Sequence, residues 1–556
     1  MDTVLRNGLV VDGTGGPGVI SDVGIAGGRI VVIGDLSDES AAQNFDLAGL
    51  VLAPGFIDIH THYDAQVLWD PDLTPSSWHG ITSVVMGNCG FGVAPLRAAD
   101  SELLRDVLCT VEGMPPATVD AIVGQDFPSV AAYLEVVERR RPRLNVGVLV
   151  GHSALRVYSM GASALDRSAR EAEMDEMASA LLAAMDGGAL GLATSRSPGH
   201  LGPPGRPVPS RLAGLDELER LATVLADAGR GVIQVTPGPD FFLAEMGSLS
   251  ARIGRPITWA ALLGSMAEFG ARRVQPGQAR ALLDQAAGFG GEVWPQISCR
   301  PVVTSFTLLE PYALRRIPAF RDLLTIAPDH RRLAYAAGSE WRARATAQLA
   351  EAWEDRWDRV QVEDCELPES SRRARSLRTL AAEAGSTPAA MMIDLAERDD
   401  FRTRFGVELF NDDVDEVAGL LNDPRCVLGL SDAGAHADQL CDAVFPTFLL
   451  GTWVRERQRL SLETAVWRLS GQPAQVMRIA GRGLIKEGLA ADLVAFDPTT
   501  VDALPLERIH DLPQGGERLI GRSVGIEHVW VNGTAVRLDG KPADGVHPGQ
   551  LLTARP

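Results

Sequence analysis

The stretch "GFIDIHTHYD", residues 55–64, places two histidines, His60 and His62, one residue apart at the end of an apolar run. In an extended strand, residues i and i+2 share a face, so both imidazoles are expected to project to the same side. A lone histidine is more often structural, whereas a pair with this geometry suits chelation. The spacing therefore predicts that this strand ends in a metal-binding pair.

Seven similar apolar runs follow, each leading through Gly or polar residues into a longer, helix-like stretch. They are "ITSVVMGNCG", "LNVGVLVGHS", "ALGLATSRSP", "GVIQVTPG", "PITWAALLGS", "EVWPQISCR" and "CVLGLSDAGA". Between them, Leu, Ala and Met recur at helical spacing in residues 175–188 and 215–229, and a glycine ends both stretches. A strand and a helix repeated in this way predict an α/β fold, a (β/α)₈ TIM-like barrel.

The two ends of the chain have a different texture of short strands and turns. Their likeness predicts one small β-sandwich domain made by residues 1–52 and 484–556, with the barrel at 53–483. Two unrelated terminal hairpins are the alternative. About 130 residues separate the seventh apolar run from the eighth, which predicts a helical insertion at about 303–400, near the mouth of the barrel.

Charge and composition limit the partners. The chain of 556 residues has 52 basic and 72 acidic side chains, a net charge of −20, and no basic run, so neither a nucleic acid nor an anionic membrane is expected. It shows no signal-peptide pattern and no apolar stretch of about 18 residues. Six scattered cysteines fit a reducing compartment. We expect a cytoplasmic protein with a small-molecule substrate; its oligomeric state stays open.

Asp432, in "GLSDAGAH", ends the eighth run, which lies beside the first once a barrel closes. A carboxylate there can bind a divalent metal and accept a proton from metal-activated water. The alternative is a helix N-cap, since Asp before a helical stretch is a common cap.

The segments "LAPGFIDIHTHYD", "GITSVVMGNCGFGVAP", "VGHSALR", "GALGLATSR" and "LGLSDAGAHAD" follow one another as in the amidohydrolase superfamily. Over nearly its whole length the chain resembles the N-acyl-D-amino-acid deacylase (D-aminoacylase) branch. The resemblance implies a metal-dependent hydrolase of non-peptide C–N amide bonds, with an N-acyl-(D-)amino acid or a related small amide as substrate. It also implies that His60, His62, Cys89 and Asp432 bind zinc, and that Asp432 carries the proton to the leaving amine.

The sequence departs from that branch at two positions. In the deacylases, strands five and six each end in a metal-binding histidine, whereas the corresponding segments here read "IQVTPG" and "ITWAALLGS". Gln234 stands near the first position, and a glutamine oxygen is a weak zinc ligand. We therefore expect one zinc ion per chain, held by His60, His62 and Asp432, with Cys89 joining them.

Other polar residues near strand ends are candidates for auxiliary roles. His152, His200 and His436 could replace a ligand or line the pocket, or be ordinary structural histidines. Arg196 and Arg300 could bind a substrate carboxylate through two parallel hydrogen bonds, or form internal salt bridges.

Two other functions fit the departure from the branch. One is a non-hydrolytic enzyme that performs a cyclisation, a C–C cleavage or a decarboxylation on a degenerate amidohydrolase site. The other is a non-catalytic barrel that binds a small molecule. The retention of His60, His62, Cys89 and Asp432 together speaks against a simple binding scaffold.

Overall fold

The computed structural model describes residues 1–202, 205–264, 277–365 and 375–554. The chain divides into two compact units. The first comprises Met1–Arg300, Asp413–Ala437 and Cys441–Pro556, and the second comprises Pro301–Asp412 and Asp438–Leu440. Within the described residues, every helix is too short or too polar to cross a membrane.

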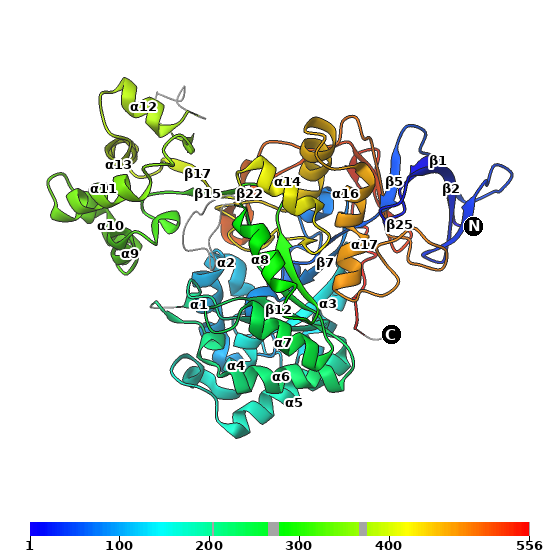
Figure 1. Cartoon of the computed structure of the whole chain (residues 1–556), viewed down its shortest axis with the longest axis horizontal. Coiled ribbons are helices and arrows are strands. Elements are labelled where there is room, and N and C mark those ends of the chain that lie inside the picture. Colours follow the sequence, from blue (N-terminus) through cyan, green and yellow to red (C-terminus); the bar gives the residue numbers. More distant parts are fainter. Residues whose placement is uncertain (203–204, 265–276, 366–374, 555–556) are drawn as a thin grey trace. The chain divides into compact units, whose positions relative to one another are not determined.

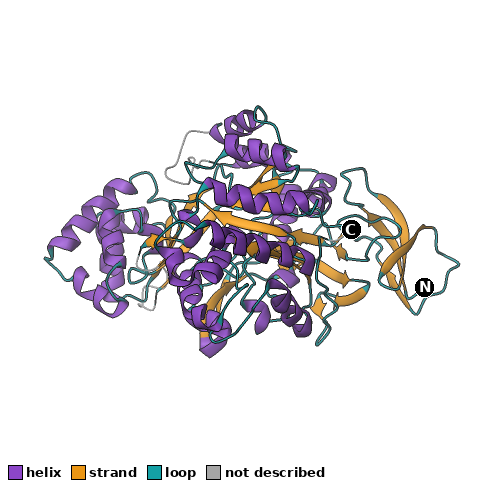
Figure 2. Cartoon of the chain, turned by 90° about the horizontal axis from the view of Figure 1, so that it is seen from below, coloured by secondary structure: helices purple, strands orange, loops and turns teal. Residues whose placement is uncertain are grey.

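The centre of the first unit is an eight-stranded parallel sheet, so the predicted barrel is confirmed. Its strands, in chain order and in spatial order, are β6 (Phe56–Asp58), β7 (Ile81–Met86), β8 (Asn145–Gly151), β9 (Gly191–Ser195), β12 (Val232–Thr236), β13 (Ile257–Trp259), β14 (Val293–Ile297) and β18 (Val427–Leu428). Figure 2 shows these strands in orange, with helices in purple on either side of them.

The strands read as continuous apolar runs because both of their faces are covered. Every residue of β7 and β8 is buried. The first and last strands approach each other just beyond their ends, where Thr61 and Ala433 form a parallel bridge and the amide of His62 donates to the Ala433 carbonyl at 2.7 Å. The sheet thus curls until the first and eighth strands meet.

Amphipathic helices cover the sheet. They are α1 (Ser101–Val111), α2 (Pro116–Val119), α3 (Val130–Arg140), α4 (His152–Met160), α5 (Glu171–Gly187), α6 (Leu215–Asp227), α7 (Leu243–Ile253), α8 (Gln278–Ala286), α14 (Val414–Asn422), α15 (Phe445–Phe448), α16 (Leu462–Leu469) and α17 (Gly471–Val476). In α5 the buried residues Met177, Leu181 and Ala184 recur every three or four positions, and Gly188 ends the helix with a φ of +117°.

Strands from both ends of the chain form a single nine-stranded sheet. Its members are β1 (Thr3–Val10), β2 (Val19–Ala26), β3 (Arg29–Gly34), β4 (Gln43–Asp46), β5 (Val51–Pro54), β19 (Leu493–Phe496), β24 (Ile526–Val531), β25 (Thr534–Leu538) and β26 (Lys541–Pro542). Antiparallel pairing of β5 with β19 joins the two sets edge to edge, and Figure 1 shows β25 near the blue N-terminal strands. Strands from the two ends of the chain therefore belong to the same sheet. The domain boundaries proposed from the sequence stay a prediction.

Short pairs of strands complete the first unit: β10 (Leu201–Gly202) with β11 (Arg206–Pro207), β20 (Asp502–Ala503) with β23 (Ser523–Val524), and β21 (Glu507–Leu512) with β22 (Gly516–Ile520).

The second unit contains a sheet as well as the helices expected there, and residues 366–374 of the predicted insertion lie outside the described residues. The strands β15 (Val302–Phe306), β16 (Val360–Asp364) and β17 (Arg404–Phe410) pair antiparallel, with β17 in the centre. The helices are α9 (Pro318–Leu324), α10 (Pro328–Arg331), α11 (Glu340–Ala352), α12 (Leu377–Glu383) and α13 (Pro388–Arg398). Its own hydrophobic core includes Phe306, Trp353 and Phe405, so this segment packs as a subdomain.

Candidate metal centre

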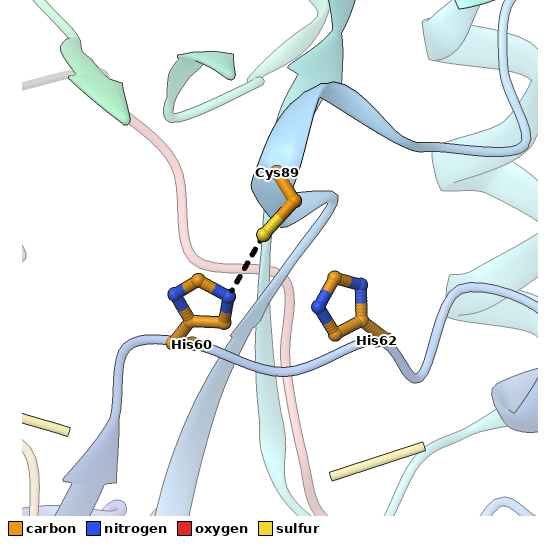
Figure 3. A group of neighbouring side chains, drawn as sticks. All are labelled: His60, His62 and Cys89. Carbon is orange, nitrogen blue, oxygen red and sulfur yellow. Dashed lines mark hydrogen bonds between the residues drawn. The ribbon is translucent and has the colours of Figure 1, made fainter. Parts of the chain in front are cut away.

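Three buried side chains converge at the carboxyl ends of the first two barrel strands (Figure 3). His60 and His62 follow β6, and Cys89 lies in the turn after β7; their exposed fractions are 0%, 2% and 8%. One ligand atom of each residue lies within 4.8 Å of those of the other two. Nε2 of His60 is 3.3 Å from Sγ of Cys89. Two imidazoles and a thiol at such distances fit a single Zn²⁺-like ion.

The turn that carries Cys89 depends on its flanking glycines. At Gly87 (φ +86°), a Cβ would lie 2.1 Å from the carbonyl oxygen of Leu149. At Gly90 (φ +79°), it would lie 3.0 Å from the amide nitrogen of Ser195. Cys89 itself has a φ of +57°, a left-handed conformation that is uncommon for residues with a Cβ. The "GNCG" motif thus lets the backbone pass close to neighbouring strands and turn the thiol toward His60.

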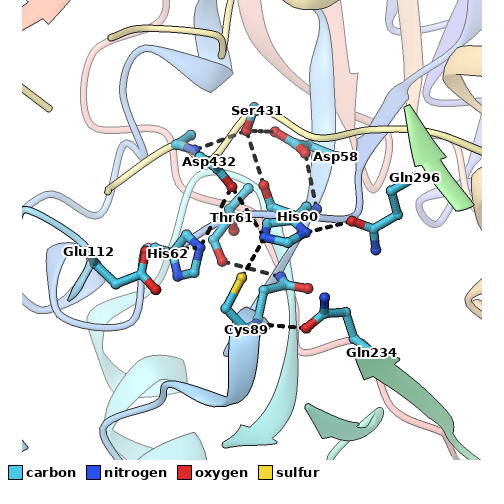
Figure 4. Close-up of polar contacts among 12 residues, drawn as sticks. Asp58, His60, Thr61, His62, Cys89, Glu112, Gln234, Gln296, Ser431 and Asp432 are labelled. Carbon is cyan, nitrogen blue, oxygen red and sulfur yellow. Dashed lines mark hydrogen bonds and ion pairs between the residues drawn. The ribbon is translucent and has the colours of Figure 1, made fainter. Parts of the chain in front are cut away.

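Asp432 completes the group from the other side of the barrel closure. Its Oδ1 lies 3.2 Å from Nε2 of His60 and 3.8 Å from Nε2 of His62 (Figure 4). The side chain is 35% exposed, unlike those of the two histidines. A φ of +50° and a hydrogen bond from its amide to the His60 carbonyl, at 3.2 Å, fix its backbone. The structure thus places an accessible carboxylate beside the buried cluster.

The buried Asp58 side chain forms hydrogen bonds that stabilise the backbone next to the cluster. The Asp58 carboxylate accepts hydrogen bonds from the hydroxyl of Ser431, at 2.5 Å, and from the amide of His60, at 3.2 Å. Burial raises the pKa of Asp58 to about 7, although both hydrogen bonds act in the opposite direction. These contacts tie the end of the first strand to the end of the eighth.

Gln296, in β14, sets the orientation of the His60 ring. Its Nε2 donates to Oγ1 of Thr258 at 3.1 Å, which leaves Oε1 facing Nδ1 of His60 at 2.6 Å. An amide oxygen only accepts, so Nδ1 must carry the proton and Nε2 must present its lone pair toward Cys89 and Asp432. Metal-binding histidines are commonly held by such an acceptor.

Gln234, in β12, lies beside Cys89 (Figure 4). Its Oε1 accepts a hydrogen bond from the backbone amide of Cys89 at 2.7 Å. Because that partner is a donor, the amide orientation is determined, and Nε2 is the free end of the group. This nitrogen is buried and has no hydrogen-bond partner among the described residues. The position predicted to lack a histidine therefore presents an N–H donor.

The electrostatics of the cluster favour a bound cation. Burial lowers the pKa of His60 and of His62, so both imidazoles are neutral ligands at pH 7. Burial and the charges of Glu112 and Asp432 raise the pKa of the Cys89 thiol. Burial, Asp432 and Asp64 likewise raise the pKa of Glu112. A divalent ion would reverse the effect on the thiol, because metal binding releases its proton.

A family model described as the amidohydrolase family matches residues 43–537. The chain belongs to this family.

Similar proteins match this amidohydrolase over its full length. The D-aminoacylase of Alcaligenes xylosoxydans xylosoxydans is 30% identical, over 99% of this chain and 97% of that protein. The N-acyl-D-glutamate deacylase of the same organism is 31% identical, over 99% and 96%.

Solved structures of related proteins share the fold. The structure of N-acyl-D-glutamate deacylase from Bordetella bronchiseptica, complexed with zinc and a phosphonate that mimics the tetrahedral intermediate, has a TM-score of 0.66 at 29% identity and covers 100% of both chains. A D-aminoacylase described as defining a novel subset of amidohydrolases has a TM-score of 0.67 at 26% identity, over 99% of both chains.

Two predicted auxiliary histidines lie around His62. The charges of His436 and His200 are among the causes, after burial and His60, that lower the pKa of His62. Nδ1 of His200 lies 2.7 Å from Oγ of Ser195, at the end of β9. The amide of His436 donates to the Glu112 carbonyl at 2.7 Å. The loop after the fourth strand therefore folds toward the site.

His152 belongs instead to a buried structural network. Its Nε2 lies 2.7 Å from Oε1 of Glu217, and its Nδ1 lies 2.9 Å from Oγ1 of Thr194. Glu217 also accepts from Nη1 of Arg156 at 2.5 Å. Burial opposes ionisation of Glu217, but these partners outweigh it and lower the pKa of the carboxyl to about 2. Both ring nitrogens of His152 are engaged in joining α4, β9 and α6.

The two candidate arginines differ in their surroundings. Arg196 pairs with Asp240 and donates to the Ala213 carbonyl at 2.6 Å, so it fastens loops to one another. Arg300 lies 3.0 Å from Oδ1 of Asp442 and stacks 5.3 Å from the centre of the Phe448 ring. The pKa of Asp442, the partner of Arg300, is raised to about 6 by burial, against the effect of Arg300, and the Asp432 charge contributes to this increase.

Glu112 and Gln296 were not predicted from the sequence. Gln296 lies in the run "EVWPQISCR", before the polar residues that end it, and a single polar residue inside a strand does not by itself indicate a site. Glu112 follows the last residue of α1 and has no motif around it, yet its Oε2 lies 3.5 Å from Nε2 of His62. Only the three-dimensional structure brings it to the site.

Proposed function

We propose that this amidohydrolase hydrolyses the amide bond of an N-acyl-D-amino acid, with one zinc ion held by His60, His62, Cys89 and Asp432. The observation that carries the proposal is the buried convergence of two imidazoles and a thiol at the barrel's carboxyl end, beside the accessible Asp432 carboxylate. The full-length likeness to D-aminoacylase and to N-acyl-D-glutamate deacylase supports this choice of reaction.

The donor set fits a divalent ion, since its nitrogen atoms are neutral and its thiol is deprotonated by binding. When bound, such an ion supplies Lewis acidity to the amide carbonyl and lowers the pKa of water. His60 is held for this task by Gln296, whose Oε1 accepts from Nδ1 at 2.6 Å.

Proton transfer is assigned to Asp432. Its carboxylate is partly exposed and can reach both a water molecule and a substrate. It accepts the proton of the attacking water and delivers it to the leaving amine nitrogen, so that the amine departs neutral.

Gln234 and Arg300 are assigned to the substrate. The buried Nε2 of Gln234 donates a hydrogen bond to the carbonyl oxygen as negative charge develops on it. Arg300, already paired with Asp442, binds the substrate carboxylate. Both groups would favour a small, carboxylate-bearing amide.

The test is a panel of N-acetyl amino acids, with D and L forms of apolar and acidic residues. Release of the free D-amino acid, abolished by a chelator and by Asp432→Asn but not by the exposed control Asp227→Asn, is expected. Turnover of a different kind, still sensitive to Asp432→Asn, would redirect the assignment to a non-hydrolytic reaction. Substrate binding indifferent to both treatments would contradict catalysis altogether.

A further inference from the structure

Glu112 brings a carboxylate into the site without the partners that a buried carboxylate requires. The residue is 4% exposed and directly follows the last residue of α1. Within the described part of the chain, its carboxylate has one ion-pair partner, Nε2 of His62 at 3.5 Å, and no hydrogen bond. Burying an ionised carboxylate is unfavourable unless it is paired and hydrogen-bonded, or coordinates a metal.

His62 also lacks a hydrogen-bond partner at one ring nitrogen, within the described residues. Its Nε2 is buried and forms no hydrogen bond with any described residue. Two carboxylate oxygens face this nitrogen, that of Glu112 at 3.5 Å and that of Asp432 at 3.8 Å. One ring nitrogen and two carboxylate oxygens therefore converge without a hydrogen bond to that nitrogen from the described residues, and one cation could bind all three groups.

The distance between Glu112 and His62 is one that two ligand atoms of the same ion can have. Bonds of about 2.0–2.3 Å in a tetrahedral zinc site place neighbouring ligand atoms about 3.3–3.8 Å apart. Oε2 of Glu112 lies 3.5 Å from Nε2 of His62, within this range, and the ligand atoms of His60, His62 and Cys89 all lie within 4.8 Å of one another. Figure 4 shows the Glu112 carboxylate beside the His62 ring.

We propose that Glu112 is a metal ligand. It adds a donor to a site to which β12 and β13 contribute no histidine. The inference rests on the metal-dependent function proposed above and assigns different tasks to the two carboxylates. Glu112, whose side chain is 5% exposed, stays on the ion, while the 35% exposed Asp432 is available to exchange protons with water and substrate. Glu112 thereby joins His60, His62, Cys89 and Asp432 around a single ion.

The experiment measures zinc affinity, which needs no substrate. The full-length protein is stripped of metal and titrated with zinc in competition with a chromophoric chelator. Glu112→Gln is expected to weaken zinc binding at least about 100-fold, since even outer partners of ligands contribute about 10–100-fold. Glu112→Asp, which keeps the charge on a shorter arm, should fall between. Glu102→Gln removes an exposed charge from the same helix and should leave the affinity within about twofold.

Two further readouts separate a ligand from a structural residue. The metal-free Glu112→Gln protein should unfold at the same temperature as wild type or higher, because the variant removes a buried carboxylate that has no hydrogen bond among the described residues. Saturating zinc should raise that temperature less than in wild type. With cobalt in place of zinc, the d–d absorption should change, while the sulfur-to-cobalt band from Cys89 persists.

The outcomes are distinct. If Glu112→Gln binds zinc as tightly as wild type, with the same cobalt spectrum, Glu112 is not a ligand, and the proposed deacylase function still stands. If zinc affinity depends on Glu112 but no N-acyl amino acid is hydrolysed, the ligand assignment holds and the proposed reaction fails. Wild-type protein that binds neither zinc nor cobalt would overturn both.

Discussion

Replacing Gln296 with leucine should lower the metal affinity of the site without changing any of the proposed ligands. The substitution removes the oxygen that lies 2.6 Å from Nδ1 of His60 and leaves the ring nitrogen buried without an acceptor. An unsatisfied buried donor costs about 1–3 kcal/mol. If the ring turns to find another partner, that cost appears as weaker metal binding, of about 10–100-fold. The two estimates agree, since tenfold corresponds to about 1.4 kcal/mol.

The assay is a competition titration of zinc against a chelator of known affinity, with metal-free protein. Thr258→Val is the matched control, because it removes the partner of Gln296 but keeps the contact with His60, and it should cost less than about tenfold. Circular dichroism confirms that each variant is folded. Zinc affinity that is equal in Gln296→Leu and in wild type would refute the claim that this glutamine orients the ligand.

Four other perturbations test separate parts of the account. Asp432→Asn should lower kcat for amide hydrolysis by about 10²–10⁴-fold, with zinc content retained; an unchanged kcat would remove it from proton transfer. Gln234→Leu should lower kcat about 10²-fold with little change in KM, and a change confined to KM would make it a binding group only. His79 is buried, and burial lowers its pKa from 6.5 to about 4. The unfolded chain therefore binds a proton that the folded chain does not, so stability falls as the pH drops from 6.5 to 4, by up to about 3 kcal/mol. His79→Gln should flatten that part of a plot of unfolding free energy against pH, and an unaltered slope would refute the assignment. Arg156→Leu leaves Glu217 buried without its cation and should lower the free energy of unfolding by about 3–5 kcal/mol; chemical denaturation that finds less than 1 kcal/mol would show that the pair is dispensable.

Local sequence patterns were sufficient to predict most of the barrel, because each strand and helix carries its own periodicity. They could not fix which side chains face inward. Trp259 ends the sixth strand, yet it packs edge-on against Phe242 with ring centres 5.5 Å apart and belongs to the large core cluster. Strand β18 has only two residues, and its place was indicated by the polar "SDAGAH" segment that follows it.

The candidate site likewise contains some residues that local sequence patterns predict and others that depend on the folded barrel. His60 and His62 could be predicted because two residues on one strand face must lie together. Gln296 acts on His60 across 236 positions of sequence, and such a contact depends on barrel closure. Arg196 is the opposite case. It is a suitable residue type at a strand end, but its guanidinium pairs with Asp240 and donates to nearby carbonyls, and the sequence could not reveal these contacts.

The central claim is metal-dependent hydrolysis, and one titration tests it most directly. Metal-free protein is given increasing zinc, and the release of free amino acid from the best N-acetyl-D-amino acid is measured at each step. We expect no release without metal and a rate that rises until one zinc per chain is bound. Full activity in the metal-free protein, or no release after complete loading, would contradict it.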